Sequence, residues 1–244
     1  MRIGRITRGR PTYGVDVGIM LLDADFPRPV GDIAHARTFD FPVHYEVTEG
    51  APVPHVVERA AVGLLDHFVR SGQRLVDRGA RVLATSCGFL AIFQRELAEK
   101  LEVPVATSSL LQVPMVLRML APDRKLCLLT VNASTLSPQH LEGAGIGAGD
   151  AERLVVAGME DSEHFYQVVV GQEGPLDVAR AEAEVVGACE AALRADPAIG
   201  AFVLECTNLP PYAEAIRQAT GLPVWDAITM VRWLQDGAEG ISSL

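Results

Sequence analysis

The sequence predicts an α/β fold of two similar lobes. Each lobe is a parallel sheet flanked by helices, the lobes are related by a pseudo-twofold axis, and the active site lies between them. Short apolar runs alternate with longer segments of helical period, which is the pattern of βαβ units. A strand, a cysteine, a helix and a second strand also recur at matched spacing in the two halves. The 244 residues suffice for one large domain or two small lobes.

The first half contains three predicted strands and three predicted helices. Apolar runs of strand length occupy 17–22, 80–85 and 103–107. Apolar residues recur at intervals of three and four, as in a helix, over 56–78, 88–101 and 109–120. Gly79 is the predicted stop of the first of these helices, and Pro114 a predicted kink in the third. Residues 23–54 are rich in Pro, Asp and aromatics, so they are expected to form a long irregular loop.

The second half repeats this alternation. Its predicted strands are 125–131, 153–158, 200–205 and 222–226, and its predicted helices are 136–146, 177–195, 210–220 and 228–234. We expect the first lobe to comprise residues 1–120 together with 224–244, and the second lobe to comprise residues 121–223.

The repeat aligns Cys87 with Cys206. Each cysteine follows an apolar run, precedes a predicted helix and lies seventeen residues before a proline, Pro104 or Pro223. Ligands of parallel sheets bind beyond the carboxyl ends of the strands. Two like lobes that face each other would therefore present the two thiols to a single cleft.

Thiols in this position have a definite chemistry. The positive end of a helix dipole can lower a cysteine pKa toward neutrality. Two close thiolates repel each other, so the pair is expected to hold one proton between them. One base and one acid on opposite sides of a carbon would support racemisation or epimerisation without a cofactor.

The stretches "TSCGFL", "LLTVN" and "LECTNLP" resemble the aspartate/glutamate/hydantoin racemase superfamily, to which maleate isomerase and arylmalonate decarboxylase are also related. The resemblance implies an isomerase in which Cys87 and Cys206 are the acid/base pair. It also implies that a substrate carboxylate, or a hydantoin carbonyl, is held between the lobes. The residues implied in holding it are Gly88, Thr130, Asn132, Thr207 and Asn208.

The sequence departs from glutamate racemases at three places. Gly88-Phe89 stands where they carry Asn-Thr, Asn208 where they carry His, and Asp23 is displaced from their Asp-Ser pair. Glutamate is therefore not the expected substrate. Arylmalonate decarboxylases keep only the second-lobe cysteine, so two cysteines argue against that reaction. Two alternatives stay open: a maleate-type cis–trans isomerase with a cysteine nucleophile, and a non-catalytic protein that binds small acids.

The loop 23–54 is the predicted specificity element. Arg28 could bind a distal carboxylate of the substrate with two hydrogen bonds, or lie solvated on the surface. Asp23 could orient a cysteine proton or cap a turn.

Composition and sequence pattern argue against nucleic acid and membranes as partners, and the expected partner is a small carboxylate or hydantoin-like substrate. The net charge of −10, from 31 acids and 21 bases, disfavours nucleic acid. No window approaches the roughly 18 apolar residues of a membrane span. The basic stretch 1–14 lacks the apolar core of a secretion signal, so a cytoplasmic location and reduced cysteines are expected. The six histidines lack metal-binding spacing, and we expect neither metal nor cofactor. The resemblance also admits a homo-oligomer.

Overall fold

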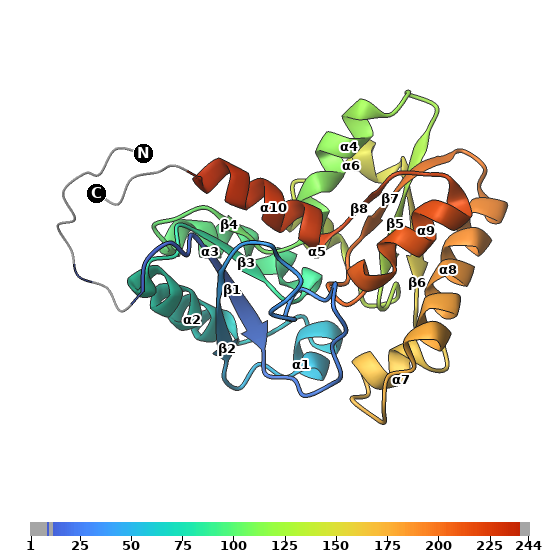
Figure 1. Ribbon diagram of the computed structural model, residues 1–244. Coiled ribbons are helices and arrows are strands. Elements are labelled where there is room, and N and C mark those ends of the chain that lie inside the picture. The colour runs from blue at the N-terminus through green and yellow to red at the C-terminus, as the bar shows by residue number, and fades with distance from the viewer. Residues whose placement is uncertain (1–8, 10–11, 240–244) are drawn as a thin grey trace.

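The computed structural model describes residues 9 and 12–239 and contains two lobes, each built on a four-stranded sheet (Figure 1). The strand orders are β2-β1-β3-β4 and β6-β5-β7-β8, and every strand pair is parallel. The predicted two-lobed α/β fold is confirmed. Most of the stretch 1–14 lies outside the described residues, so the absence of a secretion signal stays a prediction.

The first lobe contains four strands, four α-helices and two 3₁₀ helices. The strands are β1 (Val17–Leu22), β2 (Val43–Thr48), β3 (Val82–Thr85) and β4 (Val105–Ala106). The helices are α1 (Val53–Glu58), α2 (Leu65–Arg78), η1 (Gly88–Phe93), α3 (Gln94–Lys100), η2 (Ser109–Gln112) and α4 (Val113–Met119).

The rest of the chain follows the same alternation. Its strands are β5 (Lys125–Thr130), β6 (Leu154–Gly158), β7 (Ile199–Leu204) and β8 (Val224–Trp225). Its helices are α5 (Pro138–Gly143), α6 (Ala148–Ala151), α7 (Phe165–Val169), α8 (Val178–Ala195), η3 (Pro210–Tyr212), α9 (Ala213–Thr220) and α10 (Ala227–Ala238).

Backbone hydrogen bonds match between the lobes at the 119-residue spacing that separates the two aligned cysteines. The Leu83 N–H donates to the Pro104 carbonyl over 2.9 Å, and the Phe202 N–H donates to the Pro223 carbonyl over the same distance. Together with the identical strand orders, this equivalence supports the internal duplication inferred from the sequence.

The helix predicted over 56–78 is divided into α1 and α2. Ala60, Ala61 and Gly63 between them have φ values of 49°, 52° and 79°. This left-handed backbone cannot continue a right-handed helix. Apolar periodicity runs through the break, so it gave no warning of it.

The segment 23–54 is not wholly irregular as predicted. It contains β2, which pairs with β1 in register from Val17 opposite Val43. Apolar and polar residues alternate along β2, and most of them are half-buried, as on an edge strand with one solvated face. Because β2 has no continuous apolar run, the sequence pattern did not indicate a strand here.

Two helices predicted in the first lobe begin as 3₁₀ segments, η1 and η2, before α3 and α4. Pro114 lies in the first turn of α4 and does not kink it. The tight turns of η1 start directly after Cys87. No long α-helix therefore begins at this cysteine.

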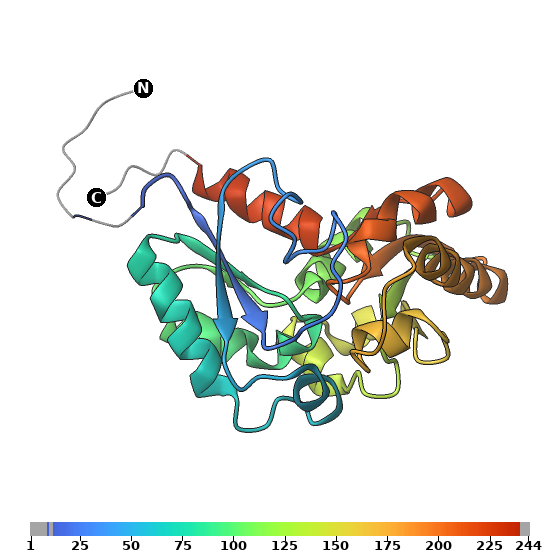
Figure 2. The ribbon, with the colours of Figure 1, turned by 60° about the horizontal axis from the view of Figure 1, so that its bottom comes forward.

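Helices cover the sheets of both lobes, with α2 beside the first sheet and α8 and α9 beside the second (Figure 2). Helix α10 returns to the first lobe and packs on β1 and β3. Because β8 pairs with β7, Val224–Trp225 belong to the second sheet rather than to the first lobe. The other predicted lobe boundaries stay a prediction.

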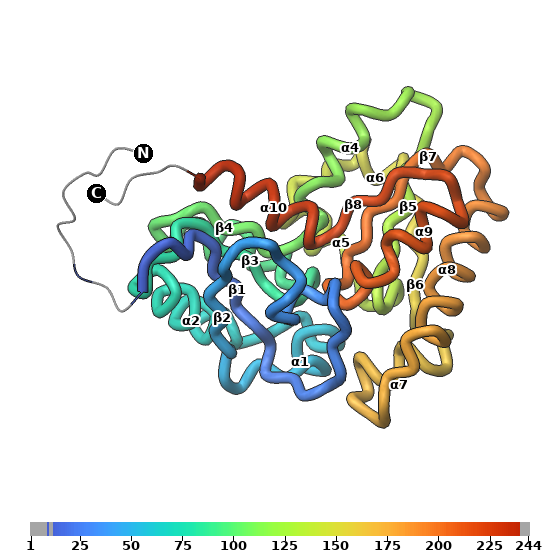
Figure 3. The backbone as a smooth tube through the Cα atoms, viewed as in Figure 1, coloured from blue at the N-terminus to red at the C-terminus, as the bar shows by residue number. Residues whose placement is uncertain are grey.

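The segment that follows β1 crosses to the second lobe, as the tube in Figure 3 shows in blue. The Asp25 N–H donates to Gln172 Oε1 over 3.1 Å, and Gly31 lies against Pro211. This segment therefore covers the junction of the lobes. Within the described residues, no helix has both the length and the apolar character needed to cross a membrane.

Candidate active site

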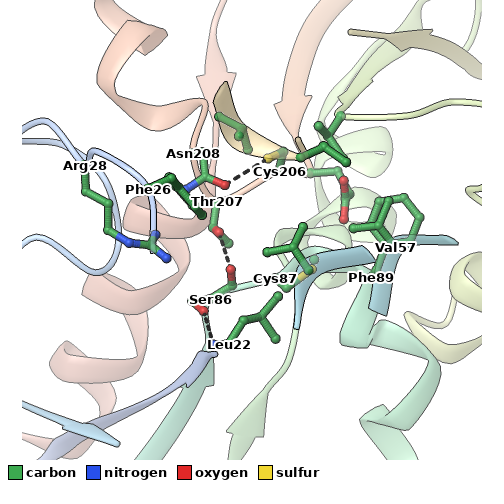
Figure 4. A pocket seen from close by; sticks show the side chains of 16 residues that line it. Leu22, Phe26, Arg28, Val57, Ser86, Cys87, Phe89, Cys206, Thr207 and Asn208 are labelled. Atoms are coloured by element: carbon green, nitrogen blue, oxygen red, sulfur yellow. Dashed lines mark hydrogen bonds between the residues drawn. The ribbon is translucent and has the colours of Figure 1, made fainter. Parts of the chain in front are cut away.

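A cavity lies between the lobes at the carboxyl ends of the strands (Figure 4), with about 380 Å³ of space not filled by protein atoms when the open solvent at its mouth is included. Cys87 enters it from the end of β3 and Cys206 from the end of β7. Its walls are mostly apolar. The lining residues are Leu22, Phe26, Arg28, Val53, Val57, Ser86, Cys87, Gly88, Phe89, Val131, Val169, Val170, Glu205, Cys206, Thr207 and Asn208.

The two cysteine segments are bound directly to each other. Thr207 Oγ1 donates to the carbonyl of Ser86 over 2.6 Å, which joins the residues beside the two cysteines. Ser109 Oγ of the first lobe donates to the Leu204 carbonyl of the second, also over 2.6 Å. Cys87 and Cys206 are 8% and 7% exposed. The lobes therefore bring both thiols to one small cavity, as predicted from the sequence.

The thiol pKa values are raised, which contradicts the expected shift toward neutrality. Burial raises the pKa of Cys87 and of Cys206, and the nearby Glu205 carboxyl raises both further. Hydrogen bonds with the Phe89 and Asn208 backbones act in the opposite direction but are smaller. The helix-dipole argument fails because the first helical turns after the cysteines are the short 3₁₀ segments η1 and η3, and the α-helices α3 and α9 begin only after them. Both side chains are therefore neutral thiols.

Glu205 is a buried acid whose charge acts on both cysteines. Its side chain is fully buried, and its Oε2 accepts a hydrogen bond of 2.7 Å from Thr130 Oγ1. Its Oε1 has no hydrogen-bond partner among the described residues. Burial raises the pKa of Glu205 to about 7, although the Thr130 hydrogen bond opposes this.

Gly88 leaves the space that Glu205 occupies. A Cβ atom on Gly88 would lie well inside van der Waals contact with Glu205 Oε1 and with the Glu205 backbone carbonyl. Only glycine therefore fits directly after the first cysteine. The departure from the Asn-Thr of glutamate racemases, noted in the sequence, has this physical cause.

A chain of polar contacts connects Arg28 to Cys206. Arg28 Nη1 donates to Asp32 Oδ1 over 3.0 Å, and Asn208 Nδ2 donates to Asp32 Oδ2 over 2.6 Å. The Cys206 thiol donates to Asn208 Oδ1 over 3.6 Å. The Arg28 guanidinium also stacks on the Phe26 ring, 4.1 Å from its centroid. These contacts hold the guanidinium at the cavity wall rather than in solvent.

Three predicted ligand-binding residues do not line the cavity. Thr130 is not part of the cavity lining, and its Oγ1 donates to the Glu205 carboxyl instead. Asn132 Nδ2 donates to the Tyr166 hydroxyl, and its Oδ1 accepts from Ser134, so it stabilises a turn. Asp23 accepts the Gly50 N–H over 3.2 Å at the surface, which fits the turn-capping alternative.

Sequence reasoning missed Glu205 and Asp32. Glu205 ends the otherwise apolar run "GAFVLE". A lone acid at the end of a buried strand is a detectable signal, because burying a carboxyl is costly without a partner. Asp32 gave no such signal, since it lies in a segment read as irregular and its burial depends on contacts with Arg28 and the second lobe.

The raised pKa of Glu205 predicts a pH-dependent stability. Between about pH 4.5 and about pH 7 this group ionises in the unfolded chain but stays protonated in the folded protein. Its contribution to the free energy of unfolding is therefore fully present below pH 4.5 and is lost as pH rises toward 7. Urea denaturation of the wild type and of Glu205→Gln should show the wild type losing stability relative to the variant across this window. Parallel profiles would contradict the assignment.

The described part of the chain contains no cluster of three or more His, Cys, Asp or Glu side chains arranged to hold a metal ion. The expectation that the protein uses neither metal nor cofactor stays a prediction.

The sequence was compared with known proteins, and no family model matches it. It is 29% identical over 235 residues to a dimethylsulfoniopropionate lyase of Durusdinium sp. clade D, covering 91% of this chain and 77% of the relative. It is 33% identical over 225 residues to dimethylsulfoniopropionate lyase 3 of Emiliania huxleyi (strain CCMP1516), covering 87% of this chain. The match spans only 57% of that second relative.

Solved structures with the same fold include racemases. Allantoin racemase from Klebsiella pneumoniae superposes with a TM-score of 0.60 at 18% identity, over 90% of this chain and 88% of that one. Glutamate racemase from Francisella tularensis subsp. tularensis SCHU S4, in complex with D-glutamate, gives 0.58 at 13% identity, over 94% and 84%. The chain therefore has the fold of the aspartate/glutamate/hydantoin racemase superfamily, and the predicted resemblance is confirmed at that level.

The predicted racemase or epimerase activity is contradicted. The relatives found by sequence are named as lyases, whereas the likeness to racemases lies in the fold at low identity. The relatives are enzymes, but their names conflict with the isomerase class. The inference from paired cysteines to racemisation was too narrow, because a base beside a carboxylate can also begin an elimination.

Proposed function

We propose that this chain, which has the racemase-superfamily fold and resembles dimethylsulfoniopropionate lyases in sequence, is a lyase that splits dimethylsulfoniopropionate or a closely similar sulfonium acid. A cysteine thiolate takes a proton from the carbon next to the carboxylate. The C–H electron pair forms the carbon–carbon double bond, and the C–S bond breaks with its electron pair on sulfur. The products are acrylate, neutral dimethyl sulfide and one proton, which the thiol passes to solvent.

The single observation that carries the proposal is that both thiols and one guanidinium line the same cavity. Figure 4 shows Arg28 on one side of the two cysteines. A carboxylate on Arg28 would place its neighbouring carbon toward the thiols, because the polar chain through Asp32 and Asn208 joins Arg28 to Cys206. Holding the carboxylate also stabilises the negative charge that develops as the proton leaves.

The elimination needs a thiolate, whereas burial and Glu205 raise the pKa values of both thiols and keep them neutral. A sulfonium substrate brings a fixed positive charge into this space. An opposite charge within a few ångströms favours the ionised form of a thiol. Substrate binding would therefore assist formation of the base, and an empty site would hold no exposed reactive thiolate.

Release of dimethyl sulfide tests the proposed function. The purified protein is incubated with dimethylsulfoniopropionate in a sealed vial, and dimethyl sulfide in the headspace is measured by gas chromatography. We expect release well above that of a heat-denatured sample, with an equal amount of acrylate in solution. Release no faster than in the denatured sample, across several sulfonium acids, would refute a lyase of this class.

Removing the guanidinium of Arg28 should weaken substrate binding. A charge-assisted hydrogen bond contributes about 1.5–3 kcal/mol, so we expect Arg28→Met to raise KM by about 10–100-fold with a smaller change in kcat. Arg37→Met is the matched control, because Arg37 is an exposed arginine of the same segment outside the cavity lining. An unchanged KM in Arg28→Met would show that the carboxylate is held elsewhere.

A further inference from the structure

The two lobes differ at the residue before each cysteine. This residue is Ser86 in the first lobe and Glu205 in the second. Their backbones are equivalent: the Ser86 N–H donates to the Met20 carbonyl over 2.9 Å, and the Glu205 N–H donates to the Leu129 carbonyl over 2.8 Å. An acid therefore occupies one of two matched positions, and it breaks the symmetry of the cavity at its buried end.

One oxygen of Glu205 has no hydrogen-bond partner among the described residues. Thr130 holds Oε2, whereas Oε1 is buried beside Gly88 and receives no hydrogen bond from the described residues. A buried acceptor without a partner costs free energy, and functional roles are a recurring reason for such an atom to persist. Because Glu205 lines the cavity, the positive charge of a bound cation could compensate this carboxylate without a hydrogen bond.

The cavity carries one charge of each sign. Within the lining set of the described chain, Arg28 is the only base and Glu205 the only acid. Glu205 lies against Gly88, the residue that precedes Phe89 in the chain, and Figure 4 shows Phe89 and Val57 on the side of the cysteines away from Arg28. The space near Glu205 therefore combines an acid with apolar walls. This combination suits a cation covered with methyl groups better than a primary ammonium, which needs several hydrogen-bond acceptors.

We propose that Glu205 is a specificity-determining residue whose carboxylate binds the alkylated cationic end of a zwitterionic substrate while Arg28 holds its carboxylate. The reacting carbon then lies between the two charges, beside the thiols. That this cation is a dimethylsulfonium group rests on the proposed function, whereas the preference for a cation over a neutral group of the same shape does not.

The bound cation would also act on the thiols. Glu205 raises the pKa values of Cys87 and Cys206 through its negative charge. A cation beside Glu205 offsets this charge, so ionisation of a thiol becomes easier only when substrate is present. Glu205 thereby couples recognition of the leaving group to formation of the base.

A matched pair of unreactive ligands tests the proposal. 3-(Trimethylammonio)propionate carries a fixed cation, and 4,4-dimethylpentanoate is its neutral carbon isostere. Dissociation constants are measured by calorimetry at pH 8. We expect the wild type to prefer the cation by about tenfold or more, as for a partly desolvated charge pair. In Glu205→Gln the preference should fall to within about twofold, because the variant keeps the shape and loses the charge.

The pH dependence of the wild type provides a second measurement that needs no variant. The pKa of Glu205 is about 7, so the preference for the cation should shrink between pH 8 and pH 5.5 as the carboxyl takes up a proton. The other ionisable groups that line the cavity are the thiols of Cys87 and Cys206 and the guanidinium of Arg28, which is paired with Asp32. The raised thiol pKa values keep both thiols neutral over this range, and arginine stays charged.

Three outcomes would overturn the inference: a wild type that does not prefer the cation, a preference that persists in Glu205→Gln, or a variant that weakens both ligands equally. The last would indicate a purely structural role for Glu205. A preference that depends on Glu205 in a protein that releases no dimethyl sulfide would instead refute the proposed lyase reaction and leave this inference standing.

Discussion

Replacing either cysteine of the cavity by alanine is expected to cause the largest loss of activity in this protein. Loss of a general base lowers a rate by about 10²–10⁴-fold. We expect kcat/KM for dimethyl sulfide release to fall by that factor in one of Cys87→Ala and Cys206→Ala, and by at least about tenfold in the other. Both thiols line the cavity in which we propose that the substrate reacts. The variant with the larger loss identifies the base.

Cys189→Ala is the matched control for these variants. Cys189 is also a buried free thiol, but it lies in α8 and away from the cavity lining. Its removal should leave kcat/KM within about threefold of the wild type, because it alters only core packing. Wild-type activity in either Cys87→Ala or Cys206→Ala would contradict the two-thiol site.

Gly88→Ala is expected to give the second largest effect, on both stability and activity. The added methyl group would overlap the Glu205 carboxyl and also its backbone carbonyl, which cannot rotate away. Overpacking of this kind costs about 1–3 kcal/mol of unfolding free energy. The displaced segment carries Cys206 next to Glu205, so activity should fall together with stability. Urea denaturation and the dimethyl sulfide assay measure the two effects.

The control for this change is another glycine-to-alanine substitution. Gly187 lies within α8, where an added Cβ meets open space. Gly187→Ala should leave activity unchanged and raise the unfolding free energy by up to about 1 kcal/mol, because alanine favours the helix. If Gly88→Ala behaved like Gly187→Ala, the close packing of Gly88 on Glu205 would be wrong.

The alternation of apolar runs and helical segments was enough to predict the two lobes, because parallel strands buried on both faces are continuously apolar. This condition holds for β1, β3, β5 and β7, whose residues are almost all buried. It fails for β2, an edge strand with half-buried residues. The break between α1 and α2 was also missed, since it depends on left-handed residues that apolar periodicity does not register.

The location of the two cysteines could be predicted, because their position in a duplicated strand–helix unit determines it. Cys87 and Cys206 met in one cavity because both follow strands that end at the junction of the lobes. Their protonation was predicted wrongly, because it depends on burial and on Glu205, which act only in the folded protein. Asp32 was missed for the same reason, since its partner Asn208 lies 176 residues further along the chain.

The most direct test of the central claim is a proton NMR time course of the protein with dimethylsulfoniopropionate. The account predicts that dimethyl sulfide and acrylate appear in equal amounts as the substrate disappears, and that both signals are lost in the double variant Cys87→Ala/Cys206→Ala. If the double variant formed these products at the wild-type rate, or if the wild type formed neither, the account would be contradicted.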